Sequence, residues 1–206
     1  MAQPRLTTMT TTRPAKRPIR FERRQTCRFH TVMRLARVER EEDVGLWRIR
    51  NISDEGMMML TGVGAEPGEP LSIGLSETVS LPGKAIWWDG QRCGVSFDRR
   101  IDCADLLHRL MEEQKAPGYR PLRLQVATRA VACCEDGLHT VRVVDVSQHG
   151  AGLLHNGHFH AGMRTKLMFE SGDEHRGVVR WTRGDRAGIY LTEPFPGPWL
   201  ESARRI

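Results

Sequence analysis

Hydrophobic and polar residues alternate with a period of two along much of the chain. The alternation is clearest in residues 46–50 and 140–146. This pattern predicts β-strands with one buried face. Glycine and proline recur between short apolar stretches, as in residues 62–64 and 67–70, which favours tight hairpin turns over helices. The sequence therefore predicts a fold built mainly of strands.

One segment departs from this pattern. In residues 102–115, Leu106, Leu107, Leu110 and Met111 recur at helical spacing, and Pro117-Gly118 follows as a stop signal. We expect a helix here. Residues 194–198 contain three prolines and are expected to be extended, with at most a short helix after them.

The same unit occurs twice, 94 positions apart. Both copies carry the signature (Asp/Asn)-x-Ser-x-x-Gly, at residues 51–56 and 145–150, each directly after an alternating stretch. The signature glycine is expected to have a positive φ in the turn. A gapless register that also aligns tryptophan, arginine and several glycines indicates duplication of a folded unit. The aligned pairs are Gly68 with Gly162, Gly83 with Gly177, Trp87 with Trp181, Gly90 with Gly184, Arg92 with Arg186, and Gly94 with Gly188.

Two motifs in the first copy resemble those of a known family. Arg24 and Arg28 form an RxxxR stretch, and the signature follows about twenty residues later. The pair of motifs resembles the PilZ domain, a bacterial receptor module for cyclic di-GMP. This resemblance covers nearly the whole chain as two tandem copies. It implies an all-β fold of two small six-stranded antiparallel barrels, with the predicted short helix between them.

The resemblance also implies a role for each motif residue. Arg24 and Arg28 would hold the phosphates or stack on a guanine, because a guanidinium pairs bidentately with phosphate and stacks on purines. Asn51 and Ser53 would hydrogen-bond a guanine, and Gly56 would allow close approach.

The second copy keeps the signature but loses the arginine spacing. Asp145, Ser147 and Gly150 are present, whereas Tyr119 stands where the register places Arg24. A shifted pair, Arg120 and Arg123, could still hold a phosphate. Two interpretations remain open: a competent second ligand site, or a copy with a structural or partner-binding role.

Charge is concentrated at one end of the chain. The net charge is +6, but residues 1–40 contain eleven basic and two acidic residues, which leaves −3 for the remainder. An anionic partner is therefore expected near the N-terminus. Residues 1–19 are expected to be a disordered basic arm, followed by a first domain of residues 20–116 and a second of residues 117–206.

Composition narrows the function classes. No apolar run approaches the roughly 18 residues of a membrane span, and residues 1–20 lack a signal-peptide pattern, so we expect a cytoplasmic protein without membrane insertion. Five cysteines without a CxxC pair argue against a disulfide framework. Met57, Met58 and Met59, with Trp87 and Trp181, are expected to pack inside the barrels.

Catalytic and metal-binding patterns are weak. The spacing of His155, His158 and His160 could ligate zinc, but the first copy has no equivalent histidines, so we expect no metal and no cofactor. No catalytic triad order or glycine-rich phosphate loop is present, so an enzyme is not expected.

The preferred interpretation is a sensor that binds cyclic di-GMP at the first domain and passes the signal to a protein partner. The first alternative is a PilZ-like adaptor that binds a protein without nucleotide. Nucleic-acid binding through the basic arm is disfavoured, because residues 1–20 contain no aromatic residue.

Overall fold

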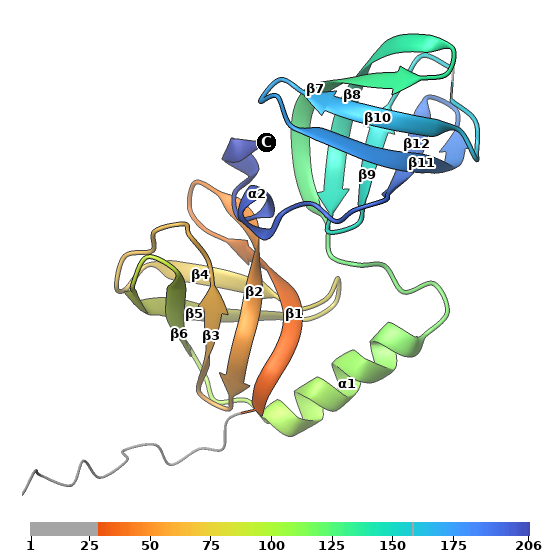
Figure 1. Cartoon of the computed structure of the whole chain (residues 1–206). Helices are drawn as coiled ribbons and strands as arrows, with labels where there is room; N and C mark the ends of the chain where they lie inside the picture. The colour runs from red at the N-terminus through yellow and green to blue at the C-terminus, as the bar shows by residue number, and fades with distance from the viewer. Residues whose placement is uncertain (1–28, 158) are drawn as a thin grey trace, which may run out of the picture.

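The computed structural model describes residues 29–157 and 159–206, which form two closed antiparallel barrels of six strands each, with helix α1 between them (Figure 1). The first barrel has the strand order β1-β2-β3-β6-β5-β4 and the second the order β10-β11-β12-β9-β8-β7. The predicted fold class is confirmed. The strands of the first barrel are β1 (Phe29–Glu39), β2 (Val44–Ser53), β3 (Gly56–Leu60), β4 (Pro70–Gly74), β5 (Ser80–Trp88) and β6 (Arg92–Phe97). Those of the second are β7 (Leu124–Cys134), β8 (Gly137–Ser147), β9 (Gly150–Leu154), β10 (Arg164–Phe169), β11 (Glu174–Arg183) and β12 (Arg186–Leu191).

Each barrel encloses its own hydrophobic core. Trp47, Ile49 and Met59 lie at the centre of the first core, and Leu153 and Leu167 at that of the second. The period-two alternation therefore marks the inner face, as predicted. Of the three consecutive methionines, Met57 and Met59 point inward and are buried, whereas Met58 lies on the outer face and is partly exposed.

Helix α1 (Cys103–Lys115) matches the predicted helix closely. The Asp102 side chain caps its N-terminus by accepting a hydrogen bond from the backbone N–H of Asp105. Leu106 and Leu110 are buried, so the apolar stripe holds α1 against the first barrel, while Met111 is exposed.

The C-terminal segment, residues 197–206, leaves the second barrel and lies against the first. It contains α2 (Gly197–Leu200) and the 3-10 helix η1 (Ala203–Arg205), next to one end of β2 (Figure 1). The indole N–H of Trp47 donates to the carbonyl of Glu201 (3.0 Å), and the backbone N–H of Gly62 donates to the Glu201 carboxylate (2.7 Å). The segment therefore joins the two barrels.

An aromatic cluster fixes the start of this segment to the second barrel. Phe195 stacks on Trp199, with ring centroids 4.2 Å apart, and His175 lies 4.4 Å from Phe195. The Trp199 indole N–H also donates to Asp173 (3.1 Å). Burial in this cluster lowers the pKa of His175, although Asp173 and Glu193 act to raise it.

We expect acid to weaken this cluster. Because the folded state lowers the pKa of His175, the folded state prefers the neutral ring, and stability is lost as the pH falls below the unfolded value of about 6.5. The variant His175→Phe should show a smaller fall in unfolding temperature between pH 7.5 and pH 5.5 than the parent chain. His160→Phe, a change at an exposed histidine, should leave the fall unchanged. Equal pH dependence in all three proteins would contradict this expectation.

No helix among the described residues is long and apolar enough to cross a membrane.

Candidate functional site

The two signatures occupy equivalent hairpins. Asn51 and Ser53 end β2 and Gly56 begins β3, while Asp145 and Ser147 end β8 and Gly150 begins β9. In each hairpin the serine hydroxyl donates to the carbonyl of the signature glycine, at 3.1 Å in the first barrel and 3.4 Å in the second. Both serines are buried, and each hydroxyl stabilises its own turn through this hydrogen bond.

The signature glycines are required for a different reason than predicted. Neither Gly56 nor Gly150 is among the glycines with positive φ, so that prediction was wrong. A Cβ atom on Gly56 would lie 2.2 Å from the carbonyl oxygen of Val95, and one on Gly150 would lie 2.9 Å from that of Ile189. These glycines let the backbone of the neighbouring strand approach closely.

Each signature turn also holds the segment that leaves its barrel. In the first barrel, the carbonyls of Asp54 and Glu55 accept from the backbone N–H groups of Ile101 and Phe97, both at 2.9 Å. The second barrel has the equivalent two hydrogen bonds 94 positions later. The carbonyl of Gln148 accepts from the N–H of Phe195, and that of His149 accepts from the N–H of Leu191, both at 2.9 Å. The first turn is thereby tied to the start of α1, and the second to the residues before the C-terminal segment.

Asp54 strengthens the connection to α1. Its carboxylate accepts from the backbone N–H of Cys103, the first residue of α1, at 3.2 Å, and pairs with Arg100 at 3.1 Å. A displacement of the first signature turn would therefore act directly on the helix between the barrels.

The signature Asn51 lies at one end of a row that crosses four strands of the first barrel. Asn51 pairs with Met58, Met58 with Gly94, and Gly94 with Trp87. Three inter-strand spacings make this row about 14 Å long. Trp87 is 40% exposed, so the prediction that it packs inside the barrel was wrong.

A glycine beneath each exposed tryptophan explains its position. A Cβ atom on Gly94 would lie 2.2 Å from Nε1 of Trp87, and one on Gly188 would lie at the same distance from Nε1 of Trp181. Each indole therefore lies flat across a bare stretch of backbone on the outer wall. The repeat does contain the signal, because tryptophan is followed by glycine seven positions later in both copies.

The corresponding row of the second barrel has different chemistry. It runs from Asp145 over Gly152 and Gly188 to Trp181, so a glycine replaces Met58 at the second position. The Asp145 carboxylate lies over Gly152 and forms an ion pair with Arg123, with 15% and 34% of the two side chains exposed. Two residues proposed for one ligand site are thus already bound to each other.

The remaining predicted site residues divide into two groups. Arg120 is exposed. Arg24 and Arg28 lie outside the described residues.

Next to the second signature, Tyr190 stacks on His149, with ring centroids 6.2 Å apart, and the Arg180 guanidinium lies 5.0 Å from the Tyr190 ring.

This cluster is absent from the first barrel, because the repeat places Ile86, Ser96 and Glu55 at the positions of Arg180, Tyr190 and His149. At these three positions the first barrel carries smaller side chains than the second. Among the described residues, no three His, Cys, Asp or Glu side chains are placed to hold a metal ion.

We expect Gly94→Ala to move the Trp87 ring without unfolding the barrel. The added methyl group would overlap the indole, which is exposed enough to swing outward. Iodide should then quench the tryptophan fluorescence more strongly than in the parent chain, while the unfolding temperature changes little. Gly188→Ala provides the matched change at Trp181. Unaltered quenching in both variants would show that the indoles do not depend on these glycines.

The sequence matches the profile of the PilZ domain over residues 20–113 and again over residues 119–194. The chain belongs to the PilZ domain family. Each PilZ match coincides with one of the two barrels, and each contains one signature hairpin. No curated protein matches the sequence.

Several solved structures are similar at low sequence identity. The Borreliella burgdorferi PlzA protein in complex with c-di-GMP is 13% identical, with 81% of this chain and 85% of that chain covered and a TM-score of 0.41. The Bacillus subtilis inhibitor of motility MotI/DgrA is 12% identical, with coverage of 79% and 88% and a TM-score of 0.32. Escherichia coli YcgR in complex with c-di-GMP is 11% identical, with coverage of 79% and 77% and a TM-score of 0.29.

Proposed function

We propose that this chain is a cytoplasmic cyclic di-GMP sensor, and not an enzyme, that binds the dinucleotide at its first PilZ barrel. Membership of a receptor family, with the complete motif pair in the first copy, is the observation that carries the proposal. The ligand-binding residues would be Arg24, Arg28, Asn51, Ser53 and Gly56. Within this proposal the chain divides into an arm of residues 1–19, a binding unit of residues 20–116 and a second unit of residues 117–206.

The shape and chemistry of the first row support this site. Asn51 carries an amide that can donate to and accept from a guanine edge, although only 5% of this residue is exposed. Trp87 offers an exposed aromatic face at the other end of the row. A row of about 14 Å is long enough for a ligand with two purine bases. Arg24 and Arg28, upstream of β1, would supply the cations for the two phosphates.

The second barrel is a poorer site in this proposal. Arg123 already neutralises Asp145, so binding a phosphate there would require that ion pair to break. Tyr190 and His149 also occupy wall positions where the first barrel has Ser96 and Glu55. We propose that the second unit has a structural or partner-binding role, and that its candidate residues Arg120, Arg123, Asp145, Ser147 and Gly150 bind the dinucleotide weakly or not at all.

The hydrogen bonds of the first signature offer a route for the signal. Ligand contacts at Asn51 and Ser53 would act on Asp54, which holds the start of α1 through Cys103 and Ile101. A change in α1 would alter how the second barrel and the C-terminal segment face the first barrel, and a protein partner could recognise that difference.

Calorimetric titration of the full chain with cyclic di-GMP, beside GTP and a short duplex DNA, tests the proposal. We expect saturable heat with cyclic di-GMP alone, and weaker binding as salt rises because phosphate pairing is partly screened. Absence of heat with cyclic di-GMP at high micromolar concentration would reject the sensor in favour of an adaptor that binds protein without nucleotide. Equal or tighter binding of the duplex would instead identify a nucleic-acid-binding protein.

A further inference from the structure

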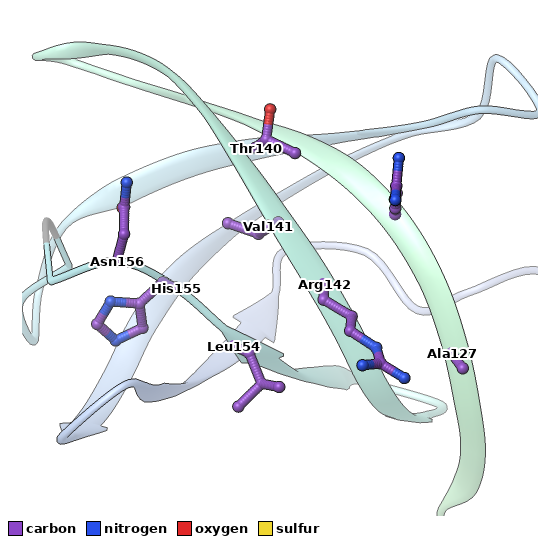
Figure 2. A pocket seen from close by; sticks show the side chains of 8 residues that line it. Ala127, Thr140, Val141, Arg142, Leu154, His155 and Asn156 are labelled. Carbon is purple, nitrogen blue, oxygen red and sulfur yellow. The ribbon is translucent and has the colours of Figure 1, made fainter.

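A shallow pocket of about 510 Å³ lies on the outer wall of the second barrel (Figure 2). β7, β8 and the end of β9 form its floor, where Ala127 and Leu154 provide apolar surface. The polar lining consists of Arg129, Thr140, Arg142, His155 and Asn156. Among the residues that the structure describes, none that lines this pocket is acidic.

The two arginines of this pocket are placed where like charges repel. Arg129 and Arg142 pair directly across β7 and β8, an arrangement that is unfavourable between like charges. Both side chains are exposed, and neither forms a hydrogen bond or ion pair within the described part of the chain. An anion bound between them would relieve the repulsion.

His155 lines the pocket with a ring whose Nε2 atom is itself buried and not open to the pocket. Its Nδ1 accepts from the backbone N–H of Gly157 at 2.9 Å, so Nε2 carries the hydrogen of the neutral ring. The side chain is about nine-tenths buried, and Nε2 has no hydrogen-bond partner in the described structure. Figure 2 shows its ring beside Asn156 and Leu154, at the edge of the pocket opposite Arg142.

The first barrel shows what the equivalent wall can bind. The repeat places Arg48 at the position of Arg142, Thr61 at that of His155 and Gly62 at that of Asn156. On the first barrel, the C-terminal segment of the same chain covers this wall. The backbone N–H of Gly62 donates to the Glu201 carboxylate, and a Cβ atom on Gly197 would lie 4.0 Å from a guanidinium nitrogen of Arg48. The first wall lacks the second arginine, because the residue that pairs with Arg48 is Leu35, whereas Arg129 pairs with Arg142 on the second barrel.

One difference between the two walls limits the mode of binding. Gly45 on the first barrel admits the backbone of Glu201, whereas His139 occupies the equivalent position on the second barrel. A segment on the second barrel therefore cannot lie as deep. Its contact would depend on a side-chain carboxylate held by the two arginines.

We propose that the pocket of the second barrel binds a short acidic peptide segment of a protein partner, which presents a Glu or Asp carboxylate to Arg129 and Arg142. The equivalent wall of the first barrel holds the Glu201 carboxylate of the C-terminal segment through the backbone N–H of Gly62, and the positive charge of the second wall is complementary to a carboxylate. The site is independent of the proposed cyclic di-GMP site, which lies on the other barrel.

The proposal is tested by amide chemical-shift titration of the full chain with a blocked hexapeptide that has the sequence of residues 197–202. This peptide contains one glutamate and none of the arginines that follow it. We expect shifts at residues 127–129, 140–142 and 154–156, and binding about tenfold or more weaker when glutamine replaces the glutamate of the peptide.

Two double variants make the test specific. R129Q/R142Q should weaken peptide binding about tenfold or more. The control R183Q/R186Q changes another exposed pair of arginines that face each other, in the β11–β12 hairpin, and should leave peptide binding unchanged. Unchanged spectra outside the pocket would confirm that each variant is folded. Equal binding of the two peptides, equal loss in both variants, or shifts confined to the first barrel would overturn the proposal. Shifts of the same residues by cyclic di-GMP but not by the peptide would identify a nucleotide surface instead.

Discussion

Replacing Gly45 with alanine is expected to detach the C-terminal segment from the first barrel. A Cβ atom at this position would lie 1.9 Å from the carbonyl oxygen of Glu201, and that oxygen accepts the indole hydrogen bond of Trp47. Neither group can move easily, because the contact is to backbone and Trp47 is fully buried. Overpacking of this kind costs about 1–3 kcal/mol, so the unfolding free energy should fall by that amount.

The indole N–H of Trp47 reports the effect directly. Its hydrogen exchange should be slow in the parent chain and much faster in Gly45→Ala, because the partner carbonyl is displaced. Gly74→Ala is the matched control, since the nearest atom to its added methyl group, the carbonyl oxygen of Arg37, lies at an ordinary contact distance of 3.5 Å. Equal stability losses in the two variants, with Trp47 still protected, would show that the segment is not held at Gly45.

The signal that predicts the fold is distributed along the whole chain. Strand alternation, hairpin glycines and the 94-residue repeat are each visible without any tertiary contact, so they predict two similar barrels and the helix between them. The helical spacing of residues 106–111 likewise depends on local periodicity alone.

Contacts between distant residues could not be predicted in this way. Nothing in the local pattern pairs Trp47 with Glu201, which are 154 positions apart, or indicates that Gly45 is needed for their approach. Aromatic size alone predicts a core position for Trp87, whereas the glycine that supports its ring on the outer wall lies on the next strand.

In the candidate site too, local contacts could be predicted from the sequence and distant contacts could not. The motifs predict which residues gather at the signature hairpins, because the hairpin itself brings Asn51, Ser53 and Gly56 together. They do not predict that Asp145 is already paired with Arg123, since that ion pair depends on how the approach to β7 runs beside β8. The ion pair between Arg123 and Asp145 distinguishes the second copy from the first more clearly than the shifted arginine spacing does.

Arg24→Ala and Arg28→Ala are each expected to weaken cyclic di-GMP binding by about 10- to 100-fold, whereas Arg123→Ala should have little effect. A charge-assisted hydrogen bond contributes about 1.5–3 kcal/mol, and both first-copy arginines are proposed to contact phosphate or guanine. Arg123 instead neutralises Asp145, so its loss should lower stability and leave affinity almost unchanged. Calorimetric titration of the three variants, beside unfolding curves for each, separates the two effects.

Asp145→Asn provides the complementary variant, because it releases Arg123 and retains the shape of the side chain. If the internal ion pair is what disables the second copy, this change should raise the number of cyclic di-GMP molecules bound by the full chain. Ser147 and Gly150 remain in place to form the turn of that site. An unchanged stoichiometry, with Arg123 shown to be free by its side-chain resonances, would mean that the stacked Tyr190 and His149 exclude the ligand. Loss of binding in Arg123→Ala with full binding in Arg24→Ala and Arg28→Ala would place the functional site on the second barrel.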